Sequence, residues 1–374
     1  MARELKVLHV VTSLEPGGME NGVVNMAVAL EPRSIRMRMA CLERAGAFCA
    51  RLPSSASVEI LGKGGGFSPK ATARLAAEIF RFRPDVIHAH NLGPLIYSGA
   101  ATAFGLSCPI IHGEHSQLTP EEKHPRRLRQ RRLLYRACRA VHTVSNGISD
   151  EILALELTKQ KPTVIANGVD TVRFAPGARG AARESLGLPI DSDYLGIVGR
   201  FGPFKRHDVL LAAFERIARQ LPRLRLLMVG GGGSEEARIA EMARQSPLSD
   251  RIHLLGFRAE PAVCYQALDL LALPSTNEGL SNAALEAMAC GIPALANVDC
   301  GHEQIITSGH DGFIAPLNDS DQLAAQLSAA LARREVLERL GENARQTIEK
   351  RFSMTAMADG YEELYRRAAR RRTR

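Results

Sequence analysis

The sequence predicts an α/β protein built from two doubly wound parallel-sheet domains. The chain has 374 residues, and a single hydrophobic core usually stops growing near about 250–300 residues, so two cores are expected. Short apolar runs alternate with helical patterns in two successive series, which is typical of parallel sheets covered by helices. Between the two series, the segment 176–183 is rich in Gly, Ala and Arg and is expected to be a linker.

The first series begins with 5–11, a continuous apolar run that is typical of a central parallel strand. Ligands of such sheets bind beyond the carboxyl ends of the strands, and His88, His90, His112 and His115 are expected there. These histidines either serve a site or hydrogen-bond the strand ends, and their spacing matches no dedicated metal-ligand motif. The other strands expected in this series are 37–42, 58–61, 86–89, 109–111, 140–144 and 163–165.

The second series begins at Tyr194 and contains the most informative stretch of the chain, 274–293. This stretch opens with a polar turn and continues as a helix rich in Ala, Leu, Glu and Met. Glu278 and Glu286 can accept hydrogen bonds from two parts of one polyhydroxylated ligand, while free amides at the helix start face its phosphates. The alternative is a helix cap at Glu278 and a solvated Glu286. The expected strands are 195–198, 224–229, 252–255, 270–273 and 312–314, with helices at 319–350 and 354–372.

Two cations follow the strand 195–198 in the turn that leads to the next helix. Arg200 can bind a diphosphate through two parallel hydrogen bonds, and Lys205 can bind it as a point charge. The pair is suited to neutralise a departing diphosphate, and two solvated surface charges are the alternative. Glycines follow other strands at 17–18 and 230–233, where the backbone can approach a phosphate or sugar closely, although a plain turn also explains the first pair.

Together these motifs resemble the GT-B-fold retaining glycosyltransferases of family 4, also called glycosyl transferases group 1. The resemblance rests on the Glu-x7-Glu spacing of Glu278 and Glu286, the Gly-Gly-x-Glu turn at 17–20 and the Asn-Gly-Val-Asp string at 167–170, and it covers nearly the whole chain. It implies two Rossmann-like domains that face a cleft, with a C-terminal helix that crosses back to the first domain. The implied parts are an acceptor-binding domain at 1–178, a nucleotide-sugar donor-binding domain at 179–350 and the returning helix at 351–374.

The resemblance also implies roles for individual residues. His115 would lie beside the sugar, and Glu278 would contact the sugar hydroxyls. Arg200 and Lys205 would bind the phosphates, which completes a set of four expected catalytic residues. At 300–304 the family usually has Gly-Gly-x-x-Glu, whereas this chain has Cys-Gly-His-Glu-Gln. Because of this difference, the identity of the donor stays open. The expected donor-binding residues are Gly17, Gly18, Gly230, Phe257, Arg258, Gly279, Leu280, Ser281 and Glu286.

The expected reaction is retaining transfer of a sugar from a UDP-sugar or GDP-sugar to a saccharide or lipid-linked acceptor, in cell-surface polysaccharide or glycolipid biosynthesis. Because two fixed cations would neutralise the leaving group, no metal and no cofactor are expected. Two alternatives stay open. A nucleotide-sugar epimerase could use His115 and Glu114 as acid and base, and a non-catalytic sugar-nucleotide sensor would only bind.

Composition predicts a cytoplasmic protein and leaves a membrane contact open. No apolar run approaches the roughly 18 residues of a membrane helix, no secretory signal is expected, and seven widely spaced cysteines indicate free thiols. The net charge of +8 favours anionic partners, but 5% aromatic residues and no Trp argue against nucleic acid. The basic segment 123–139 is either solvated or bound to the anionic inner face of the membrane. Its expected basic strip is Arg129, Arg132, Arg136 and Arg139, with Leu133, Leu134, Ala137, Cys138 and Val141 on the docked side.

Overall fold

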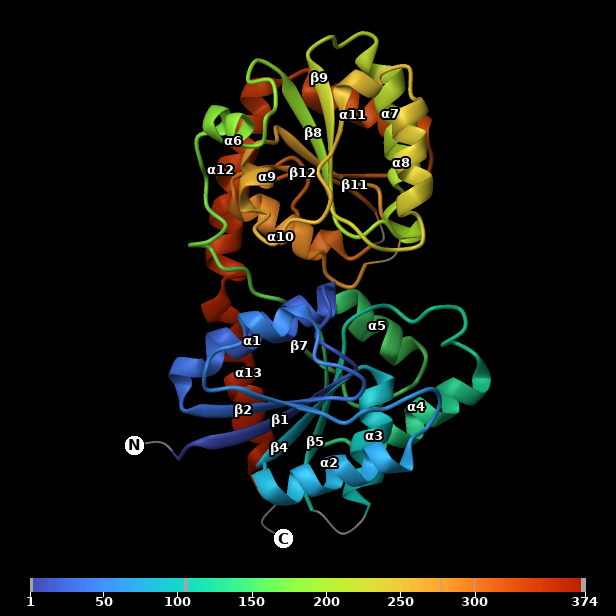
Figure 1. Ribbon diagram of the computed structural model, residues 1–374, viewed down its shortest axis with the longest axis vertical. Coiled ribbons are helices and arrows are strands. Elements are labelled where there is room, and N and C mark those ends of the chain that lie inside the picture. Colours follow the sequence, from blue (N-terminus) through green and yellow to red (C-terminus); the bar gives the residue numbers. More distant parts are fainter. Residues whose placement is uncertain (1–2, 104–106, 277, 299, 371–374) are drawn as a thin grey trace. The chain divides into compact units, whose positions relative to one another are not determined.

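The computed structural model describes residues 3–103, 107–276, 278–298 and 300–370. They form two compact units (Figure 1): an N-terminal unit, Met1–Gly168 with Met354–Arg374, and a C-terminal unit, Val169–Ser353. Each unit is built on one parallel sheet whose strands alternate along the chain with helices. The predicted pair of doubly wound parallel-sheet domains is therefore confirmed.

The N-terminal unit contains a seven-stranded sheet in the order β3-β2-β1-β4-β5-β6-β7. β1 is buried apart from half-buried Lys6, as expected for a strand covered on both faces. All strands predicted for this half of the chain are present. The strands are β1 Leu5–Val11, β2 Ile35–Cys41, β3 Ser57–Ile60, β4 Val86–His90, β5 Ile110–Glu114, β6 Ala140–Thr143 and β7 Thr163–Val164. The helices are α1 Gly18–Leu30, α2 Pro69–Phe82, α3 Leu92–Thr102, α4 Pro125–Ala137, α5 Asn146–Ala154 and α13 Met354–Ala369.

The last helix, α13, belongs to the N-terminal unit, as predicted. It packs against α1 and β4 (Figure 1). Met357, Tyr361 and Tyr365 enter the core of the unit, and each is at most 3% exposed. Because these side chains recur at helical spacing, one face of α13 is buried while its charged residues stay on the other.

The C-terminal unit contains a six-stranded sheet in the order β10-β9-β8-β11-β12-β13. The sequence predicts five of these strands and misses β12, whose Ala-Leu-Ala-Asn sequence lacks the β-branched and aromatic residues typical of strands. The strands are β8 Asp193–Val198, β9 Leu224–Val229, β10 Ile252–Leu254, β11 Leu270–Leu273, β12 Ala294–Asn297 and β13 Phe313–Ala315. The helices are α6 Arg179–Ser185, α7 His207–Ala218, α8 Glu236–Gln245, α9 Ala262–Gln266, α10 Asn282–Ala289, α11 Ser320–Leu331 and α12 Arg334–Arg351.

The segment 176–183 is not a linker, so that prediction is wrong. The helix α6 begins at Arg179, within this segment, and is part of the C-terminal unit. Arg183 on α6 is buried, and its guanidinium lies 2.7 Å from the carboxylate of Asp269. The composition of the segment gives no sign of this partner, which lies 86 residues away along the chain.

The chain joins the C-terminal unit earlier than predicted. The unit begins just after Gly168, whereas the sequence places the domain boundary after residue 178. Arg345 on α12 donates hydrogen bonds to the carbonyl oxygens of Thr171 and Phe174 at 3.0 and 2.7 Å. The chain that follows Gly168 is therefore already fixed to the helices of the C-terminal unit.

The basic segment forms α4, whose buried side carries a charge. Arg131 is 1% exposed, and its guanidinium pairs with the carboxylate of Glu114 at the end of β5 and with that of Glu122. Tyr135, which is also buried, donates its hydroxyl proton to Glu114. Two polar side chains therefore anchor α4 to the sheet.

The predicted basic strip is interrupted. Leu133, which was expected on the docked side, is 69% exposed because Arg131 and Tyr135 occupy that side, so this part of the prediction is wrong. Arg129 and Arg136 are exposed, while Arg132 donates hydrogen bonds to backbone carbonyls just after α5. Arg139, also in the strip, follows the end of α4.

The membrane contact stays a prediction. Among the described residues, every helix is too short or too polar to span a bilayer.

Candidate functional site

Three turns meet at the carboxyl ends of β8, β9 and β10 in the C-terminal unit. The amide of Gly199 donates to the carbonyl of Val229, and that of Gly230 to the carbonyl of Gly256, both at 2.9 Å. Gly230 has a φ of +142°, and a Cβ there would lie 1.9 Å from the carbonyl oxygen of Gly199, so only glycine fits. These turns stand at the edge where ligands of doubly wound sheets bind.

Lys205 and Glu278, 73 residues apart, form an ion pair at the same edge. Lys205 ends the 3-10 turn Pro203–Lys205 after β8, and Glu278 follows β11. The backbone N–H of Thr276 donates to the carbonyl of Phe204 at 3.0 Å, which holds the two turns together. The two side chains are 24% and 14% exposed. Burial raises the pKa of Glu278, but the Lys205 ammonium and further partners lower it by more, so the carboxylate is ionised at neutral pH.

The turn that carries Glu278 is held by residues that the sequence analysis did not select. The carbonyl of Ser275 accepts hydrogen bonds from the Asn297 amide at 3.2 Å and from the Cys300 thiol at 3.1 Å. His302 is fully buried, with Nδ1 3.3 Å from the Asn297 carbonyl oxygen. Burial lowers the pKa of His302, although the charge of Glu278 opposes this shift. Asn297 lies on β12. Because the sequence analysis did not predict that strand, it did not predict this hydrogen bond to the turn either.

The helix α10 begins at the predicted turn and carries the second carboxylate. Ser281 is its N-cap, because its hydroxyl accepts a backbone N–H from the first turn at 3.3 Å. Gly279 and Leu280, just before the cap, are buried. Glu286 is half-buried and accepts a hydrogen bond from the hydroxyl of Tyr265 on α9 at 2.7 Å. Burial and the charge of Glu286 raise the pKa of Tyr265. Glu286 is therefore held in place rather than solvated, and Tyr265 is a partner that sequence reasoning missed.

Three predicted residues are exposed at the same edge of the sheet. Arg200 follows β8 in the turn that also carries Lys205. Phe257 and Arg258 follow β10, and Phe257 is 57% exposed. A guanidinium can approach an anion here, and an open aromatic ring can stack on a flat base.

The other predicted residues, Gly17, Gly18 and His115, lie in the N-terminal unit. Gly17 is the N-cap of α1 and Gly18 its first residue, and a Cβ at Gly17 would meet the Glu20 carboxylate at 2.3 Å. His115 follows β5, and its Nε2 lies 3.0 Å from Nδ1 of His90. Burial lowers the pKa of His115 to about 4, so its ring is neutral at pH 7.

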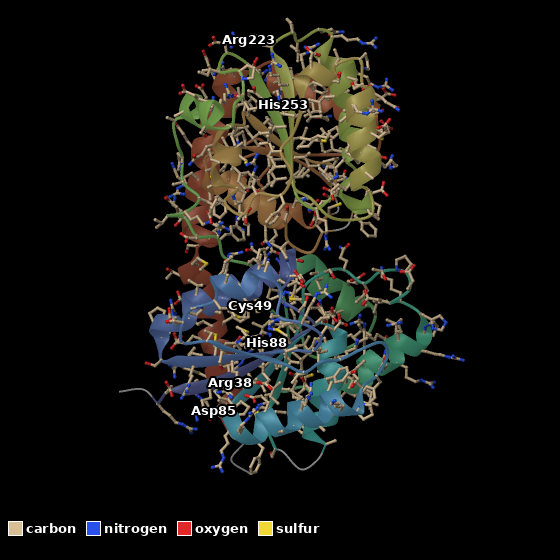
Figure 2. All side chains as sticks on the ribbon, in the orientation of Figure 1. Arg38, Cys49, Asp85, His88, Arg223 and His253 are labelled. Atoms are coloured by element: carbon tan, nitrogen blue, oxygen red, sulfur yellow. The ribbon has the colours of Figure 1, made fainter. Side chains whose placement is uncertain are left out.

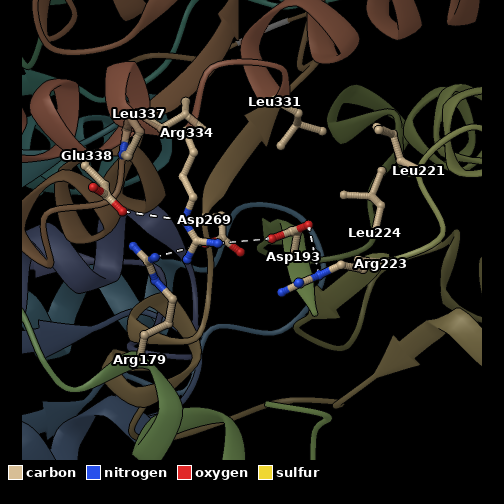
Figure 3. A pocket seen from close by; sticks show the side chains of 11 residues that line it. Arg179, Asp193, Leu221, Arg223, Leu224, Asp269, Leu331, Arg334, Leu337 and Glu338 are labelled. Atoms are coloured by element: carbon tan, nitrogen blue, oxygen red, sulfur yellow. Dashed lines mark ion pairs between the residues drawn. The ribbon is translucent and has the colours of Figure 1, made fainter. Parts of the chain in front are cut away.

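A pocket of about 240 Å³ lies at the opposite edge of the C-terminal sheet, beside the amino ends of β8, β9 and β11 (Figure 3). Its arginines face carboxylates: Arg179 lies 3.1 Å from Asp269, Arg334 3.8 Å from Asp193 and Arg223 3.9 Å from Asp193. The residues of this unit that were selected from the sequence lie at the other edge, which is therefore the candidate site.

Two family profiles match the chain. The profile of glycosyltransferase family 4 matches residues 16–173, and that of glycosyl transferases group 1 matches residues 178–347. The D-inositol 3-phosphate glycosyltransferase of Saccharomonospora viridis is 30% identical over 306 residues, which cover 76% of this chain and 70% of that protein. The protein of the same name from Rhodococcus erythropolis is 32% identical over 288 residues, which cover 74% of this chain and 63% of that protein.

Solved structures share the fold. Anabaena Alr3699/HepE in complex with UDP and glucose matches with a TM-score of 0.85 at 23% identity, over 96% of this chain and 99% of that one. Sucrose-phosphate synthase from Thermosynechococcus elongatus matches with a TM-score of 0.82 at 23% identity, over 97% of this chain and 98% of that one. The profiles, the relatives and the two parallel sheets agree with the motifs, and the chain belongs to the GT-B-fold glycosyltransferases of family 4, the glycosyl transferases of group 1.

Proposed function

We propose that this protein transfers a sugar, with retention of the anomeric configuration, from a nucleoside-diphosphate sugar to a hydroxyl of a saccharide or lipid-linked acceptor. We further propose that no divalent metal takes part. The observation that carries the proposal is the Lys205–Glu278 pair at the carboxyl edge of the C-terminal sheet, beside the glycine turns. The UDP and UDP-glucose complexes of Anabaena Alr3699/HepE favour a UDP-sugar donor over a GDP-sugar donor.

The main electrostatic task of the site is to stabilise the departing nucleoside diphosphate. As the bond between the sugar and the phosphate oxygen breaks, negative charge develops on the phosphate and positive charge on the sugar ring. Lys205 and Arg200 are assigned to that phosphate, and the amides near Gly279 at the start of α10 add further donors. The acceptor hydroxyl attacks from the face that the diphosphate leaves, which retains the configuration, and its proton passes to the departing phosphate oxygen.

The two carboxylates are assigned to the sugar and the ribose. Glu278 holds Lys205 in place without donor, and its ionised carboxylate can accept hydrogen bonds from the donor sugar. Glu286, held by Tyr265, can accept hydrogen bonds from the ribose hydroxyls. His115 is assigned to the sugar as well, because a neutral ring can hydrogen-bond without adding charge.

The acceptor and the setting are part of the proposal. The names of the relatives make a phosphorylated cyclitol one acceptor to include in any panel. Saccharides and lipid-linked saccharides of cell-surface polysaccharide and glycolipid synthesis complete that panel. The reaction would take place in the cytoplasm or at the inner face of the membrane.

The first experiment measures thermal unfolding with UDP, GDP or ADP, each with and without EDTA. A nucleotide at about 100 times its dissociation constant should stabilise the unit that binds it by roughly 2.7 kcal/mol. We expect UDP to raise the midpoint equally in EDTA, and to do so less in Lys205→Met. The matched control is Lys350→Met, which removes an exposed lysine on α12 of the same unit and should respond like wild type. No response to any nucleotide would contradict the donor site.

Turnover then separates the reaction classes. NMR of the product from a UDP-sugar and each acceptor gives the anomeric configuration, and inversion would contradict the retaining mechanism. A sugar that changes without any acceptor would indicate an epimerase. Nucleotide protection without turnover on any acceptor would indicate a sensor. Activity that EDTA abolishes and Mn²⁺ restores would refute the metal-free mechanism.

A further inference from the structure

We propose that the N-terminal unit binds a transition-metal ion between His9, His88 and His90, with His142 as the fourth ligand. His9, His88 and His90 can each present one ring nitrogen, and these three atoms lie within 4.8 Å of one another. All four side chains are fully buried. Figure 2 shows His88 in the interior of the unit, among the strands of its sheet. The proposal concerns this unit alone and does not rest on the proposed transfer reaction.

The sheet register brings the four histidines to one face. His9 on β1 is paired with His88 on β4, and His90 follows two residues later, so its side chain points to the same face. His142 on β6 is paired with Gly113 on β5. A Cβ at Gly113 would lie 2.5 Å from Nε2 of His142, so the missing side chain lets the His142 ring reach across β5.

The ring nitrogens meet in two close pairs. Nδ1 of His9 lies 3.1 Å from Nε2 of His90, and Nε2 of His88 lies 2.7 Å from Nε2 of His142. Metal–nitrogen bonds of about 2.0–2.1 Å place neighbouring ligand atoms of a tetrahedral site about 3.4 Å apart. In a tetrahedral site the two pairs would form two opposite edges, which requires the rings to move apart. His142 is assigned as the fourth ligand from its contact with His88.

Two of the four outer nitrogens, those of His88 and His90, have the partners that metal-binding histidines usually have. Nδ1 of His88 lies 2.8 Å from the hydroxyl of Tyr365 on α13, and Nδ1 of His90 lies 3.0 Å from Nε2 of His115. Such outer hydrogen bonds fix the orientation of ligand rings. In the described part of the chain, the buried Nε2 of His9 has no hydrogen-bond partner. The buried Nδ1 of His142, described in the same unit, has none either.

Imidazole ligands suit zinc and copper. The four ligands are neutral, so monovalent copper is easier to bury here than divalent zinc, whose double charge has a larger desolvation cost. Because the rings are inaccessible to solvent, the ion must enter while the unit folds. It would join β1, β4 and β6 and, through Tyr365, the helix α13.

The test loads metal during refolding. The full chain, without a polyhistidine tag, is unfolded with a chelator and refolded after its removal with Zn²⁺, with Cu⁺ and reductant, or with neither. Elemental analysis after gel filtration should find about one ion per chain in at least one metal arm. His9→Gln and His90→Gln should lower this content at least about tenfold, an effect in the range of lost metal contacts.

The matched control is His112→Gln. His112 is equally buried in the same sheet but hydrogen-bonds Glu114 and Tyr135 instead of the cluster. This variant should keep the metal, and it retains all the other histidines and cysteines of the wild type. An equal loss of metal in His112→Gln and His9→Gln would overturn the proposal. Wild-type protein that holds no metal in either metal arm would also overturn it, and the cluster would then be a network of hydrogen-bonded imidazoles.

A second measurement does not depend on variants that fold. Wild-type chain refolded with Co²⁺ should show the visible absorption of a tetrahedral nitrogen site, and an excess of Zn²⁺ present during refolding should abolish it. Absence of that band, or a spectrum of hydrated octahedral Co²⁺, would count against the site. Nucleotide protection in EDTA tests the other unit, so either proposal can fail without the other.

Discussion

Replacing Arg131 with leucine should destabilise the N-terminal unit by about 3–5 kcal/mol, because removing one partner of a buried ion pair leaves an uncompensated charge. The Arg131 side chain is 1% exposed and that of Glu114 is 3% exposed. The second partner of the arginine, Glu122, is 31% exposed and can turn to water. The cost therefore comes mainly from the carboxylate of Glu114.

The pKa of Glu114 gives a magnitude for all its partners together, of which Arg131 is one. Burial alone would raise this pKa. The net effect is a decrease from an ordinary 4.5 to about 2, caused by the hydrogen bond and charge of His112, the charge of Arg131 and the hydroxyl of Tyr135. That difference corresponds to about 3 kcal/mol of stability at neutral pH. Because the folded pKa is depressed, the contribution is complete above about pH 4.5 and is lost as the pH falls towards about 2. Arg131→Leu should therefore cost much less at pH 3 than at pH 7.

The assay is guanidinium unfolding followed by circular dichroism at pH 7 and at pH 3, with hydrogen exchange to assign the transition to the N-terminal unit. The control Arg129→Leu removes an exposed arginine of the same helix and should change stability by less than about 0.5 kcal/mol. Adding Glu114→Gln to Arg131→Leu should restore much of the loss. A cost below about 1 kcal/mol at pH 7, or an equal cost at both pH values, would refute this reasoning.

Three further substitutions test the C-terminal unit. Lys205→Met should lower kcat about 100-fold to 1000-fold in a sugar-transfer assay, and normal turnover would exclude its role at the phosphate. Gly230→Ala should weaken UDP protection in thermal unfolding, because its Cβ would meet the Gly199 carbonyl oxygen at 1.9 Å; unchanged protection would show that the turn adapts. Arg183→Met should lower the stability of the unit by about 1.5–3 kcal/mol, measured by urea unfolding, since Asp269 would keep Arg179 but lose its buried partner. A loss within experimental error would mean that water replaces the guanidinium.

The strands could be predicted well where burial on both faces leaves a continuous apolar run. β1, β9 and β11 begin and end at the predicted residues. The strand β12 was not predicted because small residues fill the space between β11 and β13. Alanine favours helix over strand when no neighbouring strand is known. Strand prediction therefore failed where packing, rather than residue type, decides the conformation.

Buried charges could not be predicted in the same way. Arg131 stands among exposed arginines, and Arg183 stands in a segment that looks like a linker. Both are buried because of a carboxylate outside their own helix, 17 and 86 residues away along the chain. Spacing within one segment reports which side is apolar, but it does not report a partner from another strand. The histidine cluster has the same origin, since β1, β4 and β6 meet only in the folded sheet.

At the candidate site, the motifs indicated where the ligand groups stand but not what holds them. The sequence selected Lys205, Glu278 and Glu286, and the structure shows Lys205 paired with Glu278. Tyr265 and Asn297 were missed, because a tyrosine on a short helix and an asparagine on an unrecognised strand carry no motif. The catalytic roles of the selected residues stay predictions until the substitutions are made.

The membership of α13 in the N-terminal unit sets an order of events during protein synthesis. The segment up to Gly168 leaves the ribosome first, yet its core lacks Met357, Tyr361 and Tyr365 until the last helix emerges. At about 5–20 residues per second, the intervening chain takes roughly 10–40 s to translate. The C-terminal unit, although later in the sequence, is thus the first whose core is complete. In the meantime the unfinished N-terminal unit exposes the apolar surface that α13 will cover.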